Sequence, residues 1–388
     1  MSVGLPPRQG LHFAQCGGWP RSCARLPVRR PLTPLGPARG FPIHRKEGRT
    51  MSVQFVKTRV QPQGIAPAEE GRALQLVELC GRTAYKSEDK ITPDSARNFV
   101  LMLKSHGHLS VLEHSNIVLE IEATPSSGAT QALSSISELY GALLDGLGFR
   151  TAYHRIHLSA RTSPGALFIA GNLRSWIETL THLGNGGSPL HALLSAALRD
   201  FFPIIFGGEE TVSSNLSFKV TLVREDEQLA LLRRDAACDL PVFVFKFVCD
   251  RGITHEVVRH RVLSFTQEST RYVNYKNKGM VLILPEELYP FYDDATQQLT
   301  GRSPLVDMWI DRAEKLFAWY REDLDREKPE IARDILPNLL KSEIFVSGRW
   351  SGWKHFVQLR DSKHAHPRIR AIAKEVRNHF DSLGMTVE

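Results

Sequence analysis

Apolar and polar positions follow two different periods along the chain, and their order predicts a mixed α+β fold. Helical spacing of apolar side chains runs through residues 68–81 and again through residues 92–107, where a Thr-Pro-Asp start supplies a capping residue and a proline in the first turn. Residues 116–122 alternate apolar and polar side chains, as a half-buried strand does. Residues 241–249 are apolar on both faces, which is typical of a central strand.

The C-terminal third continues with one strand and three amphipathic helices. We expect the strand at residues 280–284 and a long helix that begins at Ser303-Pro304. Two further helices are expected at residues 353–360 and 369–380. The pattern therefore predicts an α+β protein with a mostly antiparallel sheet flanked by helices.

Residues 124–240 interrupt this order. Apolar stripes at helical spacing run through residues 133–147 and 190–198, and a Gly-rich stretch lies between them at residues 184–188. We interpret the segment as an inserted, mainly helical subdomain. The predicted organisation is an extension at residues 1–50, an N-terminal part of the catalytic domain at 51–123, the inserted subdomain at 124–240, and a C-terminal part of the catalytic domain at 241–388.

The first 50 residues carry most of the net charge. The full chain has a formal charge of +7, whereas these residues hold nine Lys or Arg and one acid, Glu47. The remainder is therefore close to neutral. A nucleic-acid-binding domain needs a basic face on its folded part, so the charge distribution argues against that class of protein. No apolar run approaches the roughly 20 residues of a membrane span, so we expect no membrane partner.

The same extension is rich in Pro, Gly and Arg and has no apolar period, so we expect it to be disordered. An Arg-rich, acid-poor start is similar to an organelle transit peptide. The alternative, which we favour, is a start codon placed too early, with Met51 as the true first residue. The five cysteines form no CxxC pair and fit buried thiols in a reducing compartment, so we expect a cytoplasmic protein.

Residues 254–272, THEVVRHRVLSFTQESTRY, concentrate side chains that bind anions. Arg259, Arg261 and Arg271 lie here beside two histidines and several hydroxyls, and we expect Thr254 to cap the helix that carries them. Guanidinium groups this close repel one another unless anions lie between them, and their planar fork donates two parallel hydrogen bonds to phosphate. The stretch therefore predicts a pocket for a phosphorylated ligand. A solvated basic helix end is the competing interpretation.

We expect no metal at this stretch. His255 and His260 are five residues apart, whereas the zinc protease signature needs histidines four apart on one helical face. A spacing of five turns the second histidine about 140° away on a helix.

The same stretch resembles the signature of a known family. An Arg-His-Arg triplet at residues 259–261, then seven residues, then Ser269 and Arg271, is similar to the signature of the flavin-dependent thymidylate synthases. Segments around His114, Arg333 and Arg360 also resemble that family, with Arg333 expected in a short helix. The resemblance covers about residues 68–122 and 241–384.

The resemblance implies an enzyme that converts deoxyuridylate (dUMP) to thymidylate (dTMP). In that reaction methylenetetrahydrofolate gives the carbon, reduced FAD gives the hydride, and NADPH re-reduces the flavin. It also implies a homotetramer with sites built from several subunits. The chain has no Walker loop and no GxGxxG motif, so a P-loop or Rossmann site is not expected.

The resemblance also implies a role for each matched residue. Arg360 is the expected catalytic residue, because a fixed cation beside the pyrimidine favours its anionic form. Ser269 is assigned to nucleotide binding, because no base is placed by sequence to activate it. The expected dUMP contacts are Glu256, Arg259, Gln267, Ser269, Thr270, Arg271, Arg333 and Arg360. The expected FAD contacts are His114, Asn116, Arg259, His260, Arg261, Gln267, Arg349, Ser351 and His355.

The sequence departs from the family pattern at three places. Glu256 stands where Gln is common, and we expect it to pair with an arginine. Arg349 and Ser351 stand where the family usually has Asn and Arg at the flavin. Residues 168–176, FIAGNLRSW, echo residues 345–353, FVSGRWSGW, and carry Asn and Arg at these places. One hypothesis is that Asn172 and Arg174 in the inserted segment take over the flavin contacts.

Two alternatives stay open at this point. The first is a relative that binds nucleotide but lacks flavin chemistry, because the usual flavin residues are replaced at Arg349 and Ser351. The second is a basic nucleic-acid-binding protein that uses the Arg-rich extension.

Overall fold

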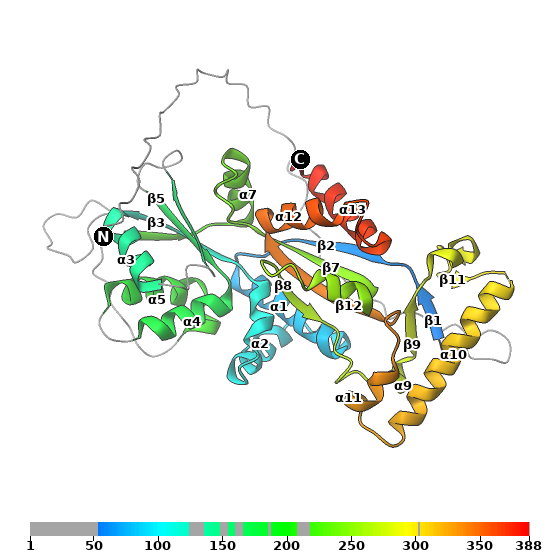
Figure 1. Ribbon diagram of the computed structural model, residues 1–388. Helices are drawn as coiled ribbons and strands as arrows, with labels where there is room; N and C mark the ends of the chain where they lie inside the picture. Colours follow the sequence, from blue (N-terminus) through cyan, green and yellow to red (C-terminus); the bar gives the residue numbers. More distant parts are fainter. Residues whose placement is uncertain are drawn as a thin grey trace, which may run out of the picture. The chain divides into compact units, whose positions relative to one another are not determined.

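Two four-stranded antiparallel sheets organise the chain (Figure 1), a computed structural model that describes residues 53–123, 136–147, 154–159, 166–184, 188–207, 218–301 and 303–387. Helices pack on both sheets, and the predicted α+β class with mostly antiparallel strands is confirmed. The described residues all belong to one compact unit, residues 39–388. The predicted disordered extension at residues 1–50 lies outside the described residues.

The first sheet, called here the β7 sheet, has the strand order β2-β7-β12-β8. Its central strand β7 is buried along nearly its whole length, as the doubly apolar pattern predicts. Alternate residues of β7 face different cores, because Val244 packs with one cluster while Phe245 and Phe247 pack with another. The strands are β2 (Arg59–Ile65), β7 (Val242–Asp250), β8 (Ser264–Gln267) and β12 (Lys341–Arg349).

The second sheet, called here the β3 sheet, has the order β4-β5-β3-β6. β3 is the strand expected near residues 116–122. The other three strands of the β3 sheet come from residues 124–240. The sequence analysis predicted no strand in that segment, whose described part adds three short strands to its helices. The strands are β3 (Ile117–Ala123), β4 (Arg155–Ser159), β5 (Ala166–Gly171) and β6 (Phe218–Leu222).

The helices before β3 match the predicted apolar stripes. Glu69 caps the first of them, because its carboxylate accepts from the backbone N–H groups of Gly71 and Arg72. The elements are α1 (Glu70–Tyr85), the 3₁₀ turn η1 (Glu88–Lys90), α2 (Ser95–Ser105) and the 3₁₀ turn η2 (Leu109–His114).

The helices between β3 and β7 in sequence pack on the apolar face of the β3 sheet and beside the segment that leads into β7. The predicted stripes at residues 133–147 and 190–198 correspond to α3 and α5, although residues 133–135 lie outside the described residues. The helices are α3 (Ile136–Leu147), α4 (Leu173–Leu183), α5 (Pro189–Phe201), α6 (Pro203–Phe206) and α7 (Glu225–Arg234).

The helix after β7 starts earlier than predicted. Asp250 caps α8 (Arg251–Val257), because its Oδ1 accepts from the N–H of Ile253 at 2.9 Å. The expected cap Thr254 lies inside the helix, where its hydroxyl donates to the carbonyl of Arg251. The expectation about Thr254 was therefore wrong, and the Arg-His-Arg triplet follows the end of α8 instead of lying on a helix.

Of the remaining elements, β9, α10, α12 and α13 agree with the predicted order. Ser303 caps α10 through its Oγ, which accepts from the N–H of Val306 at 3.2 Å. β1 and β9 form a separate parallel pair. The elements are β1 (Val53–Val56), α9 (Tyr275–Lys278), β9 (Met280–Ile283), η4 (Glu286–Phe291), β10 (Tyr292–Asp293), β11 (Gln298–Leu299), α10 (Pro304–Leu324), α11 (Pro329–Ala332), η5 (Arg333–Ile335), α12 (Trp350–Arg360) and α13 (Pro367–Ser382).

A buried cluster of opposite charges lies where β12 meets β7 and the end of β8. Lys341 Nζ donates to Glu268 Oε2 at 3.0 Å and to Glu343 Oε1 at 2.8 Å. Lys86 also reaches Glu343, at 2.5 Å, and Lys246 pairs with the other oxygen of the same carboxylate. These cations hold the pKa of Glu343 well below its ordinary value despite its burial. The cluster fixes Glu268, which lies between two predicted nucleotide contacts.

Replacing Lys341 with Met tests this cluster. Because Glu268 and Glu343 would lose a buried cation, we expect the free energy of unfolding to fall by about 3–5 kcal/mol. Urea unfolding followed by circular dichroism measures the change. Lys315→Met is the control, because Lys315 and Asp311 form an ion pair with side chains 63% and 58% exposed. That variant should change the free energy by less than about 0.5 kcal/mol, and an equal effect of both variants would contradict a structural role for the cluster.

Candidate functional site

The Arg-His-Arg triplet forms a tight turn after α8 with alternating exposure. Arg259 and Arg261 are exposed to solvent, whereas His260 is buried with 4% of its surface accessible. The turn is held by backbone hydrogen bonds from His260 to the carbonyl of Val257 and from Leu263 to that of His260. Two cations therefore point outward on either side of a buried imidazole.

Arg360, at the last residue of α12, is fixed against this turn. Its Nε donates to His260 Nε2 at 2.9 Å, and Nη1 donates to Glu256 Oε2 at 2.8 Å. Nη2 reaches the backbone carbonyl of Glu256 at 3.2 Å. These contacts join residues about a hundred positions apart in sequence, and they bring together three of the predicted site residues.

The imidazole of His260 is held neutral. Burial, together with the nearby charges of Arg360 and His355, lowers its pKa to about 4. Its Nε2 accepts the hydrogen bond from Arg360, so the proton of the neutral ring lies on Nδ1. His355 is exposed, and its ring centre lies 6.0 Å from that of His260.

Glu256 pairs with an arginine, as the sequence analysis expected, and that arginine is Arg360. The two side chains are partly buried, at 29% and 16% exposure. The carboxylate balances the guanidinium charge in this arrangement. For Arg360 to act as the expected cation beside a pyrimidine, Glu256 therefore has to move, or a ligand has to compete with Glu256 for the guanidinium.

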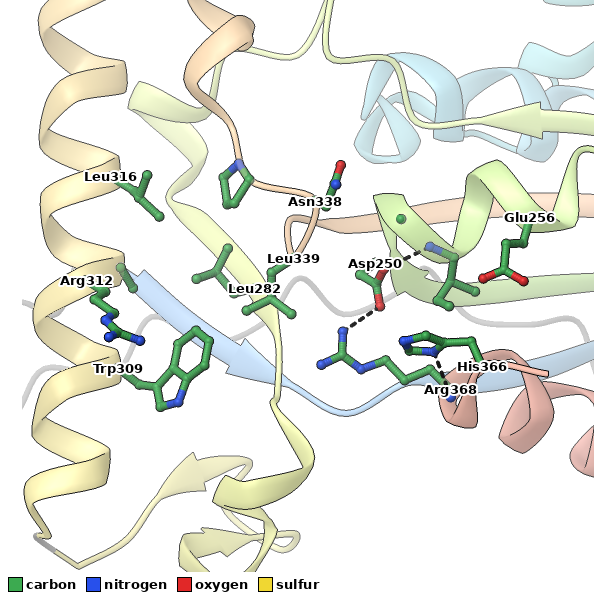
Figure 2. Close-up of a pocket in the computed structure, with 14 residues that line it drawn as sticks. Asp250, Glu256, Leu282, Trp309, Arg312, Leu316, Asn338, Leu339, His366 and Arg368 are labelled. Atoms are coloured by element: carbon green, nitrogen blue, oxygen red, sulfur yellow. Dashed lines mark hydrogen bonds and ion pairs between the residues drawn. The ribbon is translucent and has the colours of Figure 1, made fainter. Parts of the chain in front are cut away.

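A cleft of about 500 Å³ opens beside Glu256 (Figure 2). Helix α10 contributes Trp309 and Arg312 to one side of it. The opposite side carries Asp250 and Arg368, which form an ion pair at 2.9 Å. Its volume lies within the range of roughly 300–1,000 Å³ that is usual for small-molecule sites. Open space therefore lies next to the carboxylate that holds Arg360.

The segment after β8 presents the predicted hydroxyl and amide groups. Gln267 Nε2 donates to Thr254 Oγ1 at 2.9 Å and to Ser342 Oγ at 3.0 Å. Ser269 is tied to the end of α1, because its N–H donates to the carbonyl of Ala84 at 2.9 Å. The Oγ of Ser269 accepts from the backbone N–H of Arg271.

Two other predicted dUMP contacts in this region, Arg271 and Thr270, differ in solvent exposure. Arg271 is exposed, with its guanidinium 5.2 Å from the ring centre of Tyr272, whereas Thr270 is buried. Tyr85 from α1 lies 5.0 Å from Tyr272 between ring centres. The sequence analysis missed Tyr85, because only the fold brings α1 beside the signature.

Arg333 is the predicted phosphate contact outside the signature segment. It occupies η5 and is partly exposed. Within the part of the chain that the structure describes, its side chain forms no hydrogen bond or ion pair with another predicted site residue. The expected short helix before Pro337 is present as α11 followed by η5.

His114 and Asn116 point into the protein interior. His114 is completely buried, with Nδ1 2.5 Å from Ser347 Oγ and Nε2 2.9 Å from Thr266 Oγ1. Asn116 is also buried, and its Nδ2 donates to the carbonyl of Leu240 at 3.0 Å. Neither of these predicted flavin contacts is presented at the surface, and their roles at a flavin stay predictions.

Arg349 and Ser351 are engaged by the segment that precedes β7. Arg349 Nη1 donates to the carbonyls of Asp239 and Leu240 at 3.2 and 2.5 Å. Its burial lowers the pKa of its guanidinium to about 10. Ser351 Oγ donates to Asp239 Oδ2 at 2.5 Å. Both side chains bind this segment, and their predicted flavin contacts stay predictions.

Their counterparts in the echo are engaged as well. Asn172 caps α4, because its Oδ1 accepts from the N–H of Ser175 at 2.8 Å. Arg174 donates to Glu113 at 2.7 Å and to Glu178 at 2.8 Å. Two carboxylates outweigh the charge of Arg174, which weakens the hypothesis that it attracts an anionic cofactor.

Among the described residues, no cluster of three or more His, Cys, Asp or Glu side chains is arranged to hold a metal ion. In the same residues, no helix combines the length and apolar character needed to cross a membrane.

The C-terminal part of the chain is similar to known proteins. Residues 229–383 match the family described as thymidylate synthase complementing protein. Flavin-dependent thymidylate synthases from Mycobacterium tuberculosis and Mycolicibacterium gilvum are 33% and 34% identical over 133 and 132 residues. Each match covers 32% of this chain and 51% of the relative, so the chain spans about half the length of the curated relatives it matches.

A further relative and a solved structure extend the comparison. The flavin-dependent thymidylate synthase of Mycobacteroides abscessus is 32% identical over 127 residues, covering 32% of this chain and 50% of the relative. A crystal structure of the UMP/dUMP methylase PolB from Streptomyces cacaoi, bound with 5-Br UMP, is 22% identical with a TM-score of 0.31. That match covers 41% of this chain and 78% of the other, and its TM-score is too low to support an argument. These sequence matches support the family resemblance over the C-terminal part of the chain.

The burial of His114 predicts how stability depends on pH. Desolvation lowers its pKa from 6.5 to about 3, so the folded state binds fewer protons than the unfolded state between these values. Stability should therefore fall as the pH decreases below about 6.5, by up to ~1.4 kcal/mol per pH unit for this group. Burial of His260 acts in the same direction. Urea unfolding at several pH values between 7 and 5 measures the slope.

A variant without the ionisable ring separates this effect from general acid sensitivity. His114→Asn keeps a polar group near Ser347 and removes the titration, so its slope should be smaller than that of the unmodified chain. Exposed His182→Asn is the matched control and should leave the slope unchanged. Equal slopes for all three proteins would show that His114 does not control this dependence.

Proposed function

We propose that this chain is a flavin-dependent thymidylate synthase, which methylates dUMP reductively to dTMP. Its proposed co-substrates are methylenetetrahydrofolate and NADPH, and its proposed cofactor is FAD. The observation that carries the proposal is the contact of Arg360 with Glu256 and His260 inside residues 229–383, which match the family. A sequence signature and a distant arginine thereby form one structural site.

The exposed cations around this contact support a nucleotide phosphate site. Arg259 and Arg271 are exposed and belong to the signature segment, and Ser269 lies between them in sequence. A phosphate here would receive charge-assisted hydrogen bonds, each contributing roughly 1.5–3 kcal/mol when desolvated. Arg333 is the proposed further phosphate contact.

The residues present fit a flavin in part. Arg259, Arg261 and His355 are exposed around buried His260, so they can supply donors to the pyrophosphate of FAD. His114 and Arg349 are turned inward and already hold internal partners. We therefore assign the flavin to the face of the Arg-His-Arg turn, and when bound it would supply the hydride.

The chain's own contribution to catalysis is charge and position. Arg360 donates to His260 and twice to Glu256, so binding a pyrimidine oxygen exchanges its Glu256 contacts while the His260 contact keeps it in place. A ligand that draws Arg360 away from Glu256 would gain an anion-stabilising cation at a partly buried position. In the described residues no carboxylate or imidazole is hydrogen-bonded to Ser269 Oγ, which agrees with a binding role for this serine instead of a nucleophilic one.

The proposed assembly is a homotetramer in the cytoplasm. Apolar side chains beside the signature support a contact between subunits, since Val258, Val262 and Leu359 are 39%, 71% and 50% exposed. A second candidate function is a nucleotide-binding relative without flavin chemistry, which the burial of His114 and Asn116 and the internal partners of Arg349 and Ser351 favour.

One experiment tests the proposed function and separates the two candidates. The purified chain should be yellow, its flavin absorbance should bleach with NADPH, and reoxidation should need dUMP together with methylenetetrahydrofolate. Formation of dTMP is measured by chromatography. A colourless protein that binds dUMP supports the relative without flavin chemistry, and a protein that binds neither dUMP nor flavin contradicts the proposal.

Substitutions at Arg360 and Glu256 should have opposite effects. Arg360→Ala removes the proposed pyrimidine contact, so we expect kcat/KM for dUMP to fall by about 100–1,000-fold. Glu256→Gln removes a competing carboxylate, so dUMP should bind more tightly by about tenfold, or ~1.4 kcal/mol. Steady-state kinetics and dUMP titrations measure both changes.

Arg326→Ala is the matched control. Arg326 is 66% exposed and pairs with Glu322 on the surface of α10. This variant should leave both quantities unchanged. Weaker dUMP binding by Glu256→Gln would show that Glu256 is a direct ligand contact instead of a competitor for Arg360.

A further inference from the structure

The echo between residues 168–176 and 345–353 has a close structural counterpart. Each segment forms the end of a strand followed by an 11-residue helix, β5 with α4 and β12 with α12. The indole of Trp176 donates to the carbonyl of Ile117, at 3.4 Å, and that of Trp353 donates to Phe243, at 3.1 Å. Each acceptor lies on the neighbouring antiparallel strand.

The strand registers are the same in both places. Ile117 of β3 lies opposite Gly171 of β5, and Phe243 of β7 lies opposite Gly348 of β12. A Cβ at either glycine would lie within 3 Å of the residue that precedes the next strand in the sheet, His154 or Leu263. The two glycines therefore occupy equivalent, closely packed positions.

Counting from these glycines gives the two sheets the same strand order and pairing, apart from a register shift in β2 between Pro62 and Gly64. The order β6-β3-β5-β4 corresponds to β2-β7-β12-β8, and every pairing in both is antiparallel. In the edge strands, Leu222 of β6 lies opposite Leu119, and Pro62 of β2 lies opposite Phe245. Leu119 and Phe245 are each two residues beyond the indole acceptor, so the edge strands also have the same register.

A polar contact at the start of each helix is equivalent too. Glu113 lies four residues before Ile117 and accepts from Arg174 at 2.7 Å. Asp239 lies four residues before Phe243 and accepts from Ser351 at 2.5 Å. Both donors lie three residues after the equivalent glycines. Arg174 and Ser351, which the sequence analysis linked to flavin, thus have the same role, because each holds the segment that precedes the neighbouring strand.

The equivalent strands occur as two successive sets along the chain, but the first strand of each set pairs in the sheet of the other set. β2 precedes α1 and β3 in sequence, yet it pairs with β7. β6 precedes α7 and β7, yet it pairs with β3. Each copy therefore gives its first strand to the sheet of the other copy.

Contacts between the sheets follow the same symmetry. His114, three residues before Ile117, contacts Ser347 beside Gly348. The equivalent residues are Leu240 and Ala170, which belong to one apolar cluster and whose carbonyls both accept from Arg349. An approximate two-fold axis relates a contact from the first set of strands to the second with the equivalent contact from the second set to the first.

We propose that this chain is an internal pseudo-dimer of two tandem copies, residues 59–206 and 218–382, which exchange their first strands. The second copy nearly coincides with the family match at residues 229–383. The first copy is a permanent partner that buries one face of the catalytic copy. Residues 124–240 are therefore not an insertion but the end of one copy and the start of the next.

The first copy has kept the framework together with His114 and Asn116, but it lacks the arginine that the nucleotide site uses in the second copy. At the position of Arg360, twelve residues after the glycine, it carries Leu183. At the positions of Ser347 and Gln267 it carries Ala170 and Leu158. Resting on the proposed function, this predicts one nucleotide site in each chain, not two.

Disulfide trapping in the full chain tests the strand exchange. Arg59→Cys with Val248→Cys and Lys219→Cys with Glu122→Cys are equivalent cross-strand pairs. We expect both to form intrachain disulfides, identified by mass spectrometry of peptides. The control Arg59→Cys with Glu122→Cys joins a first strand to its own copy and should not form. A disulfide in the control and none in the two equivalent pairs would overturn the proposal.

Isothermal titration of the unmodified chain with dUMP tests the loss of the second site. One dUMP per chain supports a single competent copy, and two would overturn it. No binding would count against the proposed function, while disulfide trapping would still decide on the tandem copies. Arg360→Ala should abolish the titration signal, whereas Leu183→Ala at the equivalent position should leave one dUMP per chain.

Discussion

The contact of Arg360 with Glu256 and His260 is the interaction on which the site depends. It joins the end of α12 to the turn after α8, and it does so with two hydrogen bonds to side chains and one to the backbone. A partly buried guanidinium needs such partners, because leaving it unpaired costs several kcal/mol. Burial, together with the charge of Arg360, keeps His260 neutral, and Arg259 and Arg261 point outward on either side of it.

The sequence predicted several long elements, because their signals are local, but it did not predict the nine-residue strand β12. Ser303 caps α10 as expected, and the doubly apolar pattern of β7 matches its place between two cores. Thr254 was wrong as a cap because Asp250 offers the nearer acceptor to the first turn of α8. β4, β5 and β6 were missed because five or six residues give little periodicity, and their partner β3 was assigned to another part.

The candidate site was predictable by residue type but not by contact. The sequence indicated that Glu256 would pair with an arginine, whereas the choice of Arg360 depends on a fold that joins positions 104 residues apart. His114 and Arg349 carry side chains suited to a ligand, yet burial gives them internal partners. Whether a polar residue faces a ligand or a neighbouring strand is decided by tertiary packing, which no local pattern contains.

The exchange of first strands explains why the two copies have diverged unequally. β2 and β6 each pair with the other copy, so neither sheet is complete without both copies and the framework of each must persist. Charged side chains have no such constraint. A guanidinium at the position of Leu183 would need an acceptor pair like Glu256 and His260, and a copy without a ligand gains nothing from keeping them. An apolar residue is then the lower-energy choice at this position, so the first copy lacks the arginine that the second copy retains.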